Sequence, residues 1–338
     1  MPKKYPTVSF LIPTFNVEES LEACLKTIFN QDYPKNKIEV FIVDNYSTDK
    51  TLEIAKKYPV KILMNKVKDA QVGKRMAFDR AKGEFYSWID ADMELADKKW
   101  IKKMVAPMLD DEEIVASVCT FKLKGNETNL TKFLTINSLS PPGYSSQLDP
   151  IFRFFVPRVV DTIVEKRKGY SLCLYKPENI PTMGVGLYRK SKVQKTVKHQ
   201  GNKLMELDVF AHLVELGYEK FAYVSVGVYH NFMSNLWVLV KKRWRHISRN
   251  YLGQDFERSF KWFDLKNPKD VMKIILLIIY VHLFIPELLY GIYKSIKHKT
   301  WVGLYQPIVS LIETDAIILG FVYYYLKLDL FGKDKNTS

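Results

Sequence analysis

Cysteine is scarce in this chain of 338 residues, which contains only Cys24, Cys119 and Cys173. The three lie far apart and form no Cys-x-x-Cys pair, so their spacing excludes a cysteine-based metal site. Such sparse cysteine usage fits a reducing compartment, and we expect each thiol to be a small side chain in the core.

The sequence also lacks a signal peptide and a glycine-rich phosphate-binding fingerprint. The first residues, Met1-Pro2-Lys3-Lys4-Tyr5, lack the apolar run of a signal peptide. We therefore expect the Asn-x-Thr sequons at Asn126 and Asn129 to be silent in the cytosol. No G-x-G-x-x-G sequence links a strand to a helix, which excludes that phosphate-binding fingerprint.

Acidic residues are outnumbered, since 37 Asp and Glu stand against 51 Lys and Arg and give a net charge of +14. This excess indicates a polyanionic partner, which could be nucleic acid, an anionic membrane surface or a phosphorylated substrate. A hydrophobic content of 47% excludes a disordered or low-complexity chain.

Short apolar segments alternate with helical patterns through the first 120 residues. Strands are predicted at 8–12, 39–43, 61–64 and 85–89, and helical spacing follows each of the first three. Asn16 is expected to cap the first helix, with Glu19 three residues later as in a capping box. This alternation predicts an α/β fold with a mostly parallel sheet flanked by helices.

Polar residues follow three of these strands, at Pro13, Asp44 and Asp90. Because right-handed crossovers bring the carboxyl ends of parallel strands to one edge, these residues are expected to share one crevice. Asp90-Ala91-Asp92 offers two carboxylates to a hard divalent cation, which takes oxygen ligands and bridges to phosphates. The alternative is a pair of turn aspartates that cap the next helix.

Three motifs together resemble those of the family 2 glycosyltransferases: Pro13-Thr14-Phe15-Asn16-Val17-Glu18-Glu19, Val43-Asp44-Asn45-Tyr46-Ser47-Thr48-Asp49-Lys50-Thr51 and Asp90-Ala91-Asp92. The resemblance is close from residue 7 to about 120 and looser to about 232. It implies a GT-A fold and an inverting transferase that uses a nucleotide-sugar, expected to be a UDP- or GDP-sugar. It also implies that Asp44 binds the base and that Asp92 holds a Mg²⁺ or Mn²⁺ on the diphosphate.

The same resemblance extends the predicted donor site. Thr14 and Glu18 fall where the family lines the nucleoside pocket, and Lys74 could add a positive charge beside the diphosphate, with a surface lysine as the alternative. Val224–Tyr229 is predicted as a strand ending at His230, which joins the metal in some members and is otherwise structural. The predicted donor-binding set is Pro13, Thr14, Asn16, Glu18, Asp44, Lys74 and Asp90, and the predicted metal ligands are Asp90, Asp92 and His230.

The predicted catalytic residues are Glu206 and Asp208, which precede a helix that ends at Gly217-Tyr218. The family usually carries Glu-Asp-x-Asp here, and the Asp of Glu-Asp is the general base. Counting back from Gly217 puts Glu206 at that position and Asp208 at the later acidic one. Residues two apart on a helix face differently, so only one is expected to point into the cleft. Both could instead be first-turn acids near a helix N-terminus.

Residues 121–183 show less pattern. Leu148–Val164 is aromatic and apolar, and it is either a pair of core helices or an acceptor-side segment against the membrane surface. Met183–Ser191 resembles the family's glycine-containing strand before the acceptor site, where glycines would let the backbone approach the substrate.

The C-terminal third is first basic and then apolar. Lys241–Lys273 contains ten Lys or Arg against four Asp or Glu, with interleaved aromatic residues, which predicts an interface-seeking segment. Val271–Tyr293 and Trp301–Leu326 are each long enough to span a bilayer, but both contain carboxylates, so a re-entrant or interfacial hairpin stays open. The basic link Lys294–Lys299 argues against an external location. The predicted domains are a glycosyltransferase domain at 1–232, a basic amphipathic segment at 233–270 and two hydrophobic helices, transmembrane or re-entrant, at 271–338.

These features predict a membrane-attached inverting glycosyltransferase with its catalytic domain on the cytoplasmic side. The expected partners are a nucleotide-sugar donor, a lipid-linked or glycan acceptor presented at the membrane, and the membrane itself. Nucleic acid is not expected, because apolar C-terminal segments serve no purpose in a charge-driven nucleic-acid-binding protein. A processive synthase is not expected either, since only two candidate spans and no Gln-x-x-Arg-Trp motif are present. The main alternative is a catalytically inactive membrane scaffold that retains the fold.

Overall fold

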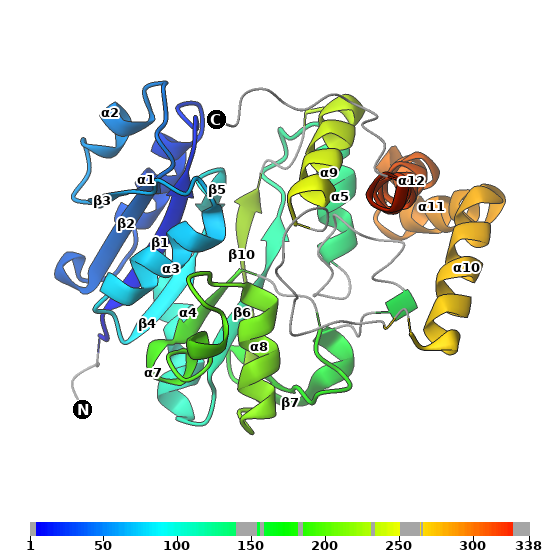
Figure 1. The fold of residues 1–338 in the computed structure, drawn as a ribbon. Helices are drawn as coiled ribbons and strands as arrows, with labels where there is room; N and C mark the ends of the chain where they lie inside the picture. Colours follow the sequence, from blue (N-terminus) through cyan, green and yellow to red (C-terminus); the bar gives the residue numbers. More distant parts are fainter. Residues whose placement is uncertain are drawn as a thin grey trace. The chain divides into compact units, whose positions relative to one another are not determined.

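The computed structural model describes residues 5–139, 154–155, 159–181, 185–230, 234–250, 264 and 266–326 (Figure 1). The chain divides into two compact units, which are described separately. Unit 1 comprises Met1–Asn126, Asn137–Ser145 and Val156–Phe232, and unit 2 comprises Glu127–Ile136, Ser146–Phe155 and Met233–Ser338. The three predicted domain boundaries stay a prediction.

Unit 1 is built on ten strands: β1 (Val8–Thr14), β2 (Ile38–Asp44), β3 (Lys61–Met64), β4 (Phe85–Trp88), β5 (Met93–Leu95), β6 (Ala116–Lys122), β7 (Ile163–Arg167), β8 (Tyr170–Leu174), β9 (Gly186–Arg189) and β10 (Lys220–His230). They form one sheet in the order β3-β2-β1-β4-β9-β6-β10-β8-β7, and β5 pairs with β10 off this path (Figure 1). β1 is parallel to both β2 and β4, β2 is parallel to β3, and β6 is parallel to β10. The predicted α/β fold with a mostly parallel sheet is confirmed.

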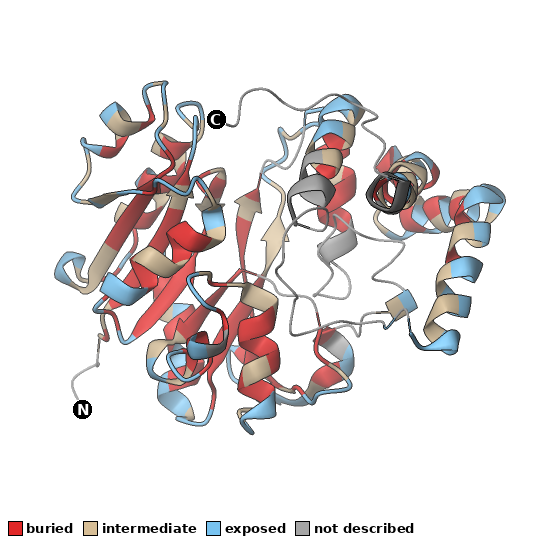
Figure 2. Ribbon diagram, in the orientation of Figure 1, coloured by how far each residue is buried: buried red, intermediate tan, exposed pale blue. Residues whose placement is uncertain are grey.

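Helices flank this sheet: α1 (Leu21–Phe29), α2 (Thr51–Ala55), α3 (Ala70–Arg80), α4 (Trp100–Asp110), α7 (Lys190–Val193) and α8 (Glu206–Glu215), with short 3₁₀ turns at η1 (Lys35–Lys37), η3 (Val159–Thr162) and η4 (Val197–His199). α1 shows why they pack there, since Leu21, Cys24, Leu25 and Ile28 recur at helical spacing and are completely buried. The strands and the inner faces of the flanking helices share the buried core (Figure 2). All three cysteines are free and buried, as predicted.

The prediction that Asn16 caps the first helix is wrong. α1 begins at Leu21, after Ser20, and Asn16 adopts a φ of +50°. Its side chain instead accepts a hydrogen bond from the N–H of Thr48 at 2.9 Å, in the loop after β2. An asparagine tolerates this left-handed backbone, and its short amide reaches a neighbouring loop more readily than a helix start five residues away.

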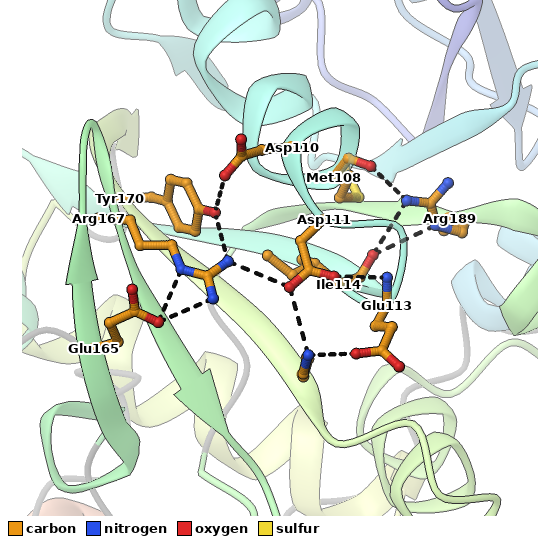
Figure 3. A network of polar contacts seen from close by, with 10 residues as sticks. Met108, Asp110, Asp111, Glu113, Ile114, Glu165, Arg167, Tyr170 and Arg189 are labelled. Atoms are coloured by element: carbon orange, nitrogen blue, oxygen red, sulfur yellow. Dashed lines mark hydrogen bonds and ion pairs between the residues drawn. The ribbon is translucent and has the colours of Figure 1, made fainter.

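A separate ionic network surrounds the C-terminal end of α4 and the β7–β8 hairpin (Figure 3). Arg167 lies 3.3 Å from Asp111 and 2.9 Å from Glu165, and it donates a hydrogen bond to the Tyr170 hydroxyl at 3.2 Å. Lys220 lies 3.5 Å from Asp111 and also pairs with Glu113. We call these side chains the α4-end network, and each of its charges contacts an opposite charge.

Unit 2 is helical and contains α5 (Asn129–Leu139, in part), α9 (Leu236–Asn250), α10 (Pro268–His282), α11 (Ile285–Lys297), η5 (Trp301–Tyr305) and α12 (Gln306–Leu326). Within the described residues, one stretch, Trp301–Gly320, is long and apolar enough to cross a membrane. The chain breaks at Leu283 and Phe284 between α10 and α11, so Val271–Tyr293 is not one continuous helix, and the spanning and re-entrant interpretations of this segment both stay predictions. The two helices are bent by 75°.

Several predictions fall partly or wholly outside the described residues. They concern most of Leu148–Val164, the start of Met183–Ser191 and the aromatic residues between 251 and 263 of the basic segment. The described end of the second segment forms β9, and the described start of the basic segment forms most of α9.

Candidate functional site

Asp44, at the end of β2, fixes the loops that follow the first two strands. Its carboxylate accepts hydrogen bonds from the Thr14 hydroxyl at 2.9 Å, the Ser47 hydroxyl at 2.6 Å and the Ser47 N–H at 2.7 Å. Asp44 has an exposed fraction of 0%, so its carboxylate meets the chain itself and not solvent. The predicted base-binding residue therefore lies beneath the loop surface. We call Asp44 and its two hydrogen-bond donors, Thr14 and Ser47, the Asp44 clamp.

Further hydrogen bonds join the same two loops. The Asn16 N–H donates to the Ser47 hydroxyl at 2.9 Å. Glu18 accepts from the N–H of Lys50 at 2.9 Å, and its own N–H donates to Asp49 at 3.0 Å. These contacts join the first motif, which contains Asn16 and Glu18, to the second, which contains Asp49, and they hold the carboxyl ends of β1 and β2 together as one rim.

Two exposed aromatic residues on this rim were not singled out by sequence reasoning. Phe15 and Tyr46 expose 53% and 41% of their surface, and each lies next to a residue of the clamp. Tyr46 also has a φ of +64°, which is unusual for a bulky residue and tends to occur at functional sites. Exposed aromatic rings at such a rim are suited to stacking on a nucleobase.

Lys74, from the middle of α3, forms the centre of a second cluster. It is buried, pairs directly with Glu206 at the start of α8 and lies 3.9 Å from the carboxylate of Asp90. Burial by itself would lower the pKa of Lys74, but the carboxylates of Glu206 and Asp90 outweigh that effect and raise it. Lys74 is thus a buried cation held between two acids, and the surface-lysine alternative is excluded.

The two predicted catalytic acids are placed differently. The side chain of Glu206 keeps 23% of its surface exposed and lies within 3.5 Å of the Gln71 amide as well as in contact with Lys74. Asp208 is 1% exposed and lies inside the first turn of α8. Only Glu206 therefore reaches the surface beside Asp90, while Asp208 is directed into the interior.

Asp92 and His230 form a third contact at the carboxyl edge of the sheet. The Nε2 of His230, the last residue of β10, lies 3.2 Å from Oδ1 of Asp92. Two neighbouring ligands of an octahedral Mg²⁺, each about 2.1 Å from the ion, would lie about 3 Å apart. The observed separation therefore fits a shared divalent cation as well as a direct hydrogen bond.

The three predicted metal ligands do not gather into one cluster. Asp90 is directed toward Lys74, and no group of three His, Cys, Asp or Glu side chains suited to an ion occurs in the described part of the chain. Mg²⁺ commonly takes only one or two protein carboxylates and completes its shell with water and substrate phosphates. Asp92 and His230 meet that smaller requirement.

Buried aromatic rings of β4 and β9 lie near the cluster of Lys74 and Glu206. Trp88 of β4 stacks on Tyr188 of β9 with ring centroids 4.2 Å apart, and Tyr86 packs against both. Burial, reinforced by the charge of Glu206, raises the pKa of Tyr86 and keeps its phenol neutral. Sequence reasoning missed these rings because their apolar alternation reads only as strand core.

A hollow with a volume of about 340 Å³ lies elsewhere, on α3 and the residues near Gly201. Arg75 and Asp79 line it, and Arg75 already binds Asp79 and the carbonyls of Val197 and Gly201. The hollow contains no predicted site residue, so the chemistry is better placed at the carboxyl edge.

Comparison with known proteins relates part of the chain to a family of transferases. Residues 9–168 match the family model described as Glycosyl transferase family 2. The chain is 30% identical over 147 residues to "Probable glycosyltransferase YdaM" of Bacillus subtilis, an alignment that covers 40% of this chain and 35% of that protein. It is 37% identical over 86 residues to the Methanococcus voltae "Dolichyl N-acetyl-alpha-D-glucosaminyl phosphate 3-beta-D-2,3-diacetamido-2,3-dideoxy-beta-D-glucuronosyltransferase", covering 23% of this chain and 27% of that protein. The chain thus spans about a third or less of the length of these relatives.

The fold also resembles that of solved structures over nearly the whole chain. The mannosyltransferase PcManGT from Pyrobaculum calidifontis, in complex with GDP-Man and Mn²⁺, superposes with a TM-score of 0.52, covering 96% of this chain and 89% of that one. At 15% sequence identity this likeness concerns the fold, and the arrangement is GT-A-like.

Proposed function

We propose, from the premise that residues 9–168 form a family 2 glycosyltransferase domain, that the chain moves a sugar with inversion from a nucleoside-diphosphate donor to an acceptor presented at a membrane. The observation that carries the proposal is the grouping at the carboxyl edge of the sheet. A buried lysine between two carboxylates and a carboxylate–histidine pair come from elements far apart in sequence. A purely structural sheet edge would not need this concentration of charge in one place.

The donor would bind along the rim formed by the β1 and β2 loops. Its base would lie against Phe15 or Tyr46, and the Asp44 clamp with Thr14 would keep the rim in place, which makes Asp44 a supporting residue. Asn16 and Glu18 would act in the same way through the loop contacts described above, and Pro13 lies in β1 opposite Val43 of β2. We keep UDP- and GDP-sugars as the donor classes.

The diphosphate would lie between Asp92 and Lys74. Asp92 and His230 would hold Mg²⁺ or Mn²⁺, with Asp90 beside them, and a cation bound there would neutralise the charge that develops on the leaving diphosphate. Lys74 supplies a fixed positive charge 3.9 Å from Asp90 and so supports the same negative group from the protein side.

Inversion requires one carboxylate within reach of the acceptor hydroxyl and opposite the leaving group. Glu206 is the better candidate for this base, because it is partly exposed beside Asp90 while Asp208 is buried. Lys74 orients the Glu206 carboxylate through their direct contact. Asp208 would stabilise the first turn of α8 from inside.

Membrane attachment is proposed from unit 2, which is apolar outside and polar inside. Most of the large apolar side chains that are exposed among the described residues lie between 272 and 322. The carboxylates in these helices have protein partners: Glu287 accepts from Gln306 at 2.6 Å, Glu313 pairs with Arg243, and Asp315 lies 3.0 Å from His282. This pattern suits an apolar solvent, where unpaired carboxylates are strongly disfavoured.

The acceptor would accordingly be lipid-linked or a glycan held at the membrane, with the catalytic domain on the cytoplasmic side. The dolichyl-phosphate substrate in the name of the Methanococcus voltae relative is consistent with such an acceptor. We do not expect nucleic acid as a partner.

Thermal unfolding of the purified full chain with a panel of nucleotide-sugars tests the proposal. We expect one UDP- or GDP-sugar to raise Tm in the presence of Mn²⁺, and Asp92→Asn to abolish the metal-dependent part. Asp32→Asn, which removes a surface carboxylate paired with Lys102, is the matched control and should keep the shift. Stabilisation without any sugar transfer would favour the inactive-scaffold alternative, and no stabilisation by any nucleotide-sugar would contradict the proposal.

A further inference from the structure

The bent pair α10–α11 is the part of unit 2 for which the sequence left a bilayer span and a re-entrant hairpin open. From its shape, exposure and charge, we infer that it is a re-entrant wedge that dips into one leaflet of an anionic lipid bilayer and returns to the side from which it entered. The inference rests on the membrane attachment proposed above and specifies how that attachment is made.

The apex of the pair is apolar and exposed. Leu283, Phe284 and Ile285 expose 60%, 46% and 65% of their surface, and they lie at the break between the helices. Both arms continue the exposed apolar surface, through Ile275 and Ile279 on α10 and through a matching row on α11. Contiguous apolar exposure of this kind is unfavourable in water and marks a contact with protein or lipid.

The break is built into the backbone. Phe284 has a φ of +60°, which a bulky residue seldom adopts, and Pro286 occupies the first turn of α11, where its missing N–H is harmless. The next helix therefore starts in a new direction, and the 75° bend is a fixed corner.

The arm lengths fit one leaflet. At 1.5 Å per residue the 15 residues of α10 and the 13 of α11 are about 22 Å and 20 Å long, while a hydrocarbon core is about 30 Å thick, so neither arm spans it alone. Placed symmetrically with its apex inward, a pair bent by 75° would descend about 12–14 Å along each arm, close to half the core.

The two arms together are long enough to cross the bilayer as one broken span. The distribution of charge distinguishes the wedge from such a span. Lys266, Lys269 and Lys273 lie at the entering end, and Lys297 and Lys299 lie at the leaving end. Basic residues flanking apolar segments stay on the cytoplasmic side and are attracted to anionic headgroups. With lysines at both ends, the two ends are expected on the same side.

A polar seam on the inner side of α11 holds the wedge to α12. Ser310 donates to Glu287 at 2.8 Å, and Gln306 bridges Glu287 to Lys294. Gly291 packs so tightly that an added Cβ would lie 2.6 Å from the carbonyl oxygen of Gly303. These contacts are buried, so they persist when the outer face meets hydrocarbon.

The histidine next to the apex is also paired. His282, at the end of α10, lies 3.0 Å from Asp315 of α12, and its other ring nitrogen lies 2.8 Å from the carbonyl oxygen of Ile278. Pairing reduces the penalty of bringing both groups toward lipid.

Single-cysteine labelling tests the wedge, because the three native cysteines are buried in unit 1. The full chain is placed in sealed vesicles of phosphatidylcholine and phosphatidylglycerol and treated with a membrane-impermeant maleimide. Lys269→Cys and Lys299→Cys report the two ends, Ile285→Cys reports the apex, and Lys57→Cys marks the side of unit 1. We expect the first two to label in the same proportion as Lys57→Cys, and Ile285→Cys to label only after detergent is added.

Protection of Lys299→Cys where Lys269→Cys is labelled would show a broken span and overturn the wedge. Labelling of Ile285→Cys without detergent, at the rate of Lys57→Cys, would place the apex outside the bilayer and overturn it as well. Failure of the chain to float with vesicles would remove membrane attachment and the wedge together, whereas wrong labelling of a floating protein would remove the wedge alone. Sugar transfer measured on the same protein reports the catalytic proposal independently.

A matched pair of substitutions adds a second readout. Ile285→Asp should lower partition into these vesicles by about tenfold or more, because a carboxylate is strongly disfavoured in hydrocarbon. Val164→Asp changes an apolar side chain of similar exposure in β7 and should leave partition unchanged. Equal partition of the two variants would contradict insertion of the apex.

Discussion

Unit 1 holds two concentrations of charge that differ in kind. In the α4-end network, Arg167 and Lys220 meet three carboxylates at a partly exposed surface (Figure 3). At the carboxyl edge of the sheet, Lys74 is buried between Asp90 and Glu206, with Asp92 and His230 nearby in the fold. In the first arrangement two cations pair with three carboxylates, whereas in the second Lys74 lies between two carboxylates and a third, Asp92, pairs with His230. The larger local excess of negative charge in the second arrangement suits a divalent cation and its phosphate ligand.

Removing the proposed base should have the largest effect among the substitutions that test this difference between the two groups of charge. Glu206→Gln should lower turnover by about 10²–10⁴-fold while the dissociation constant of the donor stays within about threefold, because the base acts on the acceptor. Asp208→Asn should instead lower stability, with a milder loss of turnover. Measuring donor binding beside turnover for both variants decides between them. Dead turnover with normal stability and donor binding in Asp208→Asn alone would make Asp208 the base.

Lys74→Met should have the next largest effect. It removes the cation while keeping a buried side chain of similar length, so we expect turnover to fall by about 10–10²-fold and donor binding to weaken. Lys74→Arg should restore part of the donor affinity, because it restores the charge. An unchanged dissociation constant for the donor in Lys74→Met would remove the lysine from the diphosphate site.

Asp44→Asn tests whether the clamp supports the rim. The loss of charge weakens the hydrogen bonds from Thr14 and Ser47, so stability should fall by about 1–3 kcal/mol. Donor affinity should fall with it, even without metal. If affinity falls while urea unfolding shows unchanged stability, then Asp44 contacts the base directly.

The α4-end network should give the smallest effects. Arg167→Met should change stability by less than about 1 kcal/mol, since partly exposed ion pairs contribute little, and should leave turnover unchanged. Burial would raise the pKa of Asp111, but the N–H of Glu113 and the charges of Arg167 and Lys220 lower it below its usual 3.8. As the pH falls, the Asp111 carboxylate therefore takes up its proton in the unfolded chain before it does so in the folded chain. The stabilisation that its ion pairs supply is present above about pH 4, and it is lost as the pH falls through the lower pKa of Asp111 in the folded chain. Acid unfolding of wild type and Arg167→Met should converge below that pH, and a persistent difference would contradict the assignment.

The sequence predicted those parts of the fold that depend on local pattern. Lys61–Met64 forms β3 with the predicted bounds, because a short apolar strand between turn residues is recognisable on its own. The gathering of Asp44 and Asp90 at one edge followed from topology alone. By contrast, Lys74 and Glu206 are 132 residues apart, and nothing local signals their contact.

The errors have equally physical causes. Asn16 matched a capping pattern, but its side chain accepts a hydrogen bond from the N–H of Thr48, which is distant in sequence. The run from Val271 to Tyr293 left a span and a re-entrant hairpin both open, because it is apolar on both sides of its corner and hydropathy does not register the left-handed Phe284 that divides it. Such backbone turns are set by tertiary contacts and leave little trace in composition.

The central claim is that the carboxyl edge binds a nucleoside-diphosphate sugar through a divalent cation. Its most direct test is calorimetric titration of the full chain with UDP and GDP, with and without Mn²⁺, for wild type, Asp92→Asn and the network control Asp111→Asn. We predict that Mn²⁺ tightens binding of one nucleotide to wild type and to Asp111→Asn, and that Asp92→Asn binds it equally weakly in both conditions. Metal-dependent binding that survives in Asp92→Asn with unchanged affinity would contradict the account.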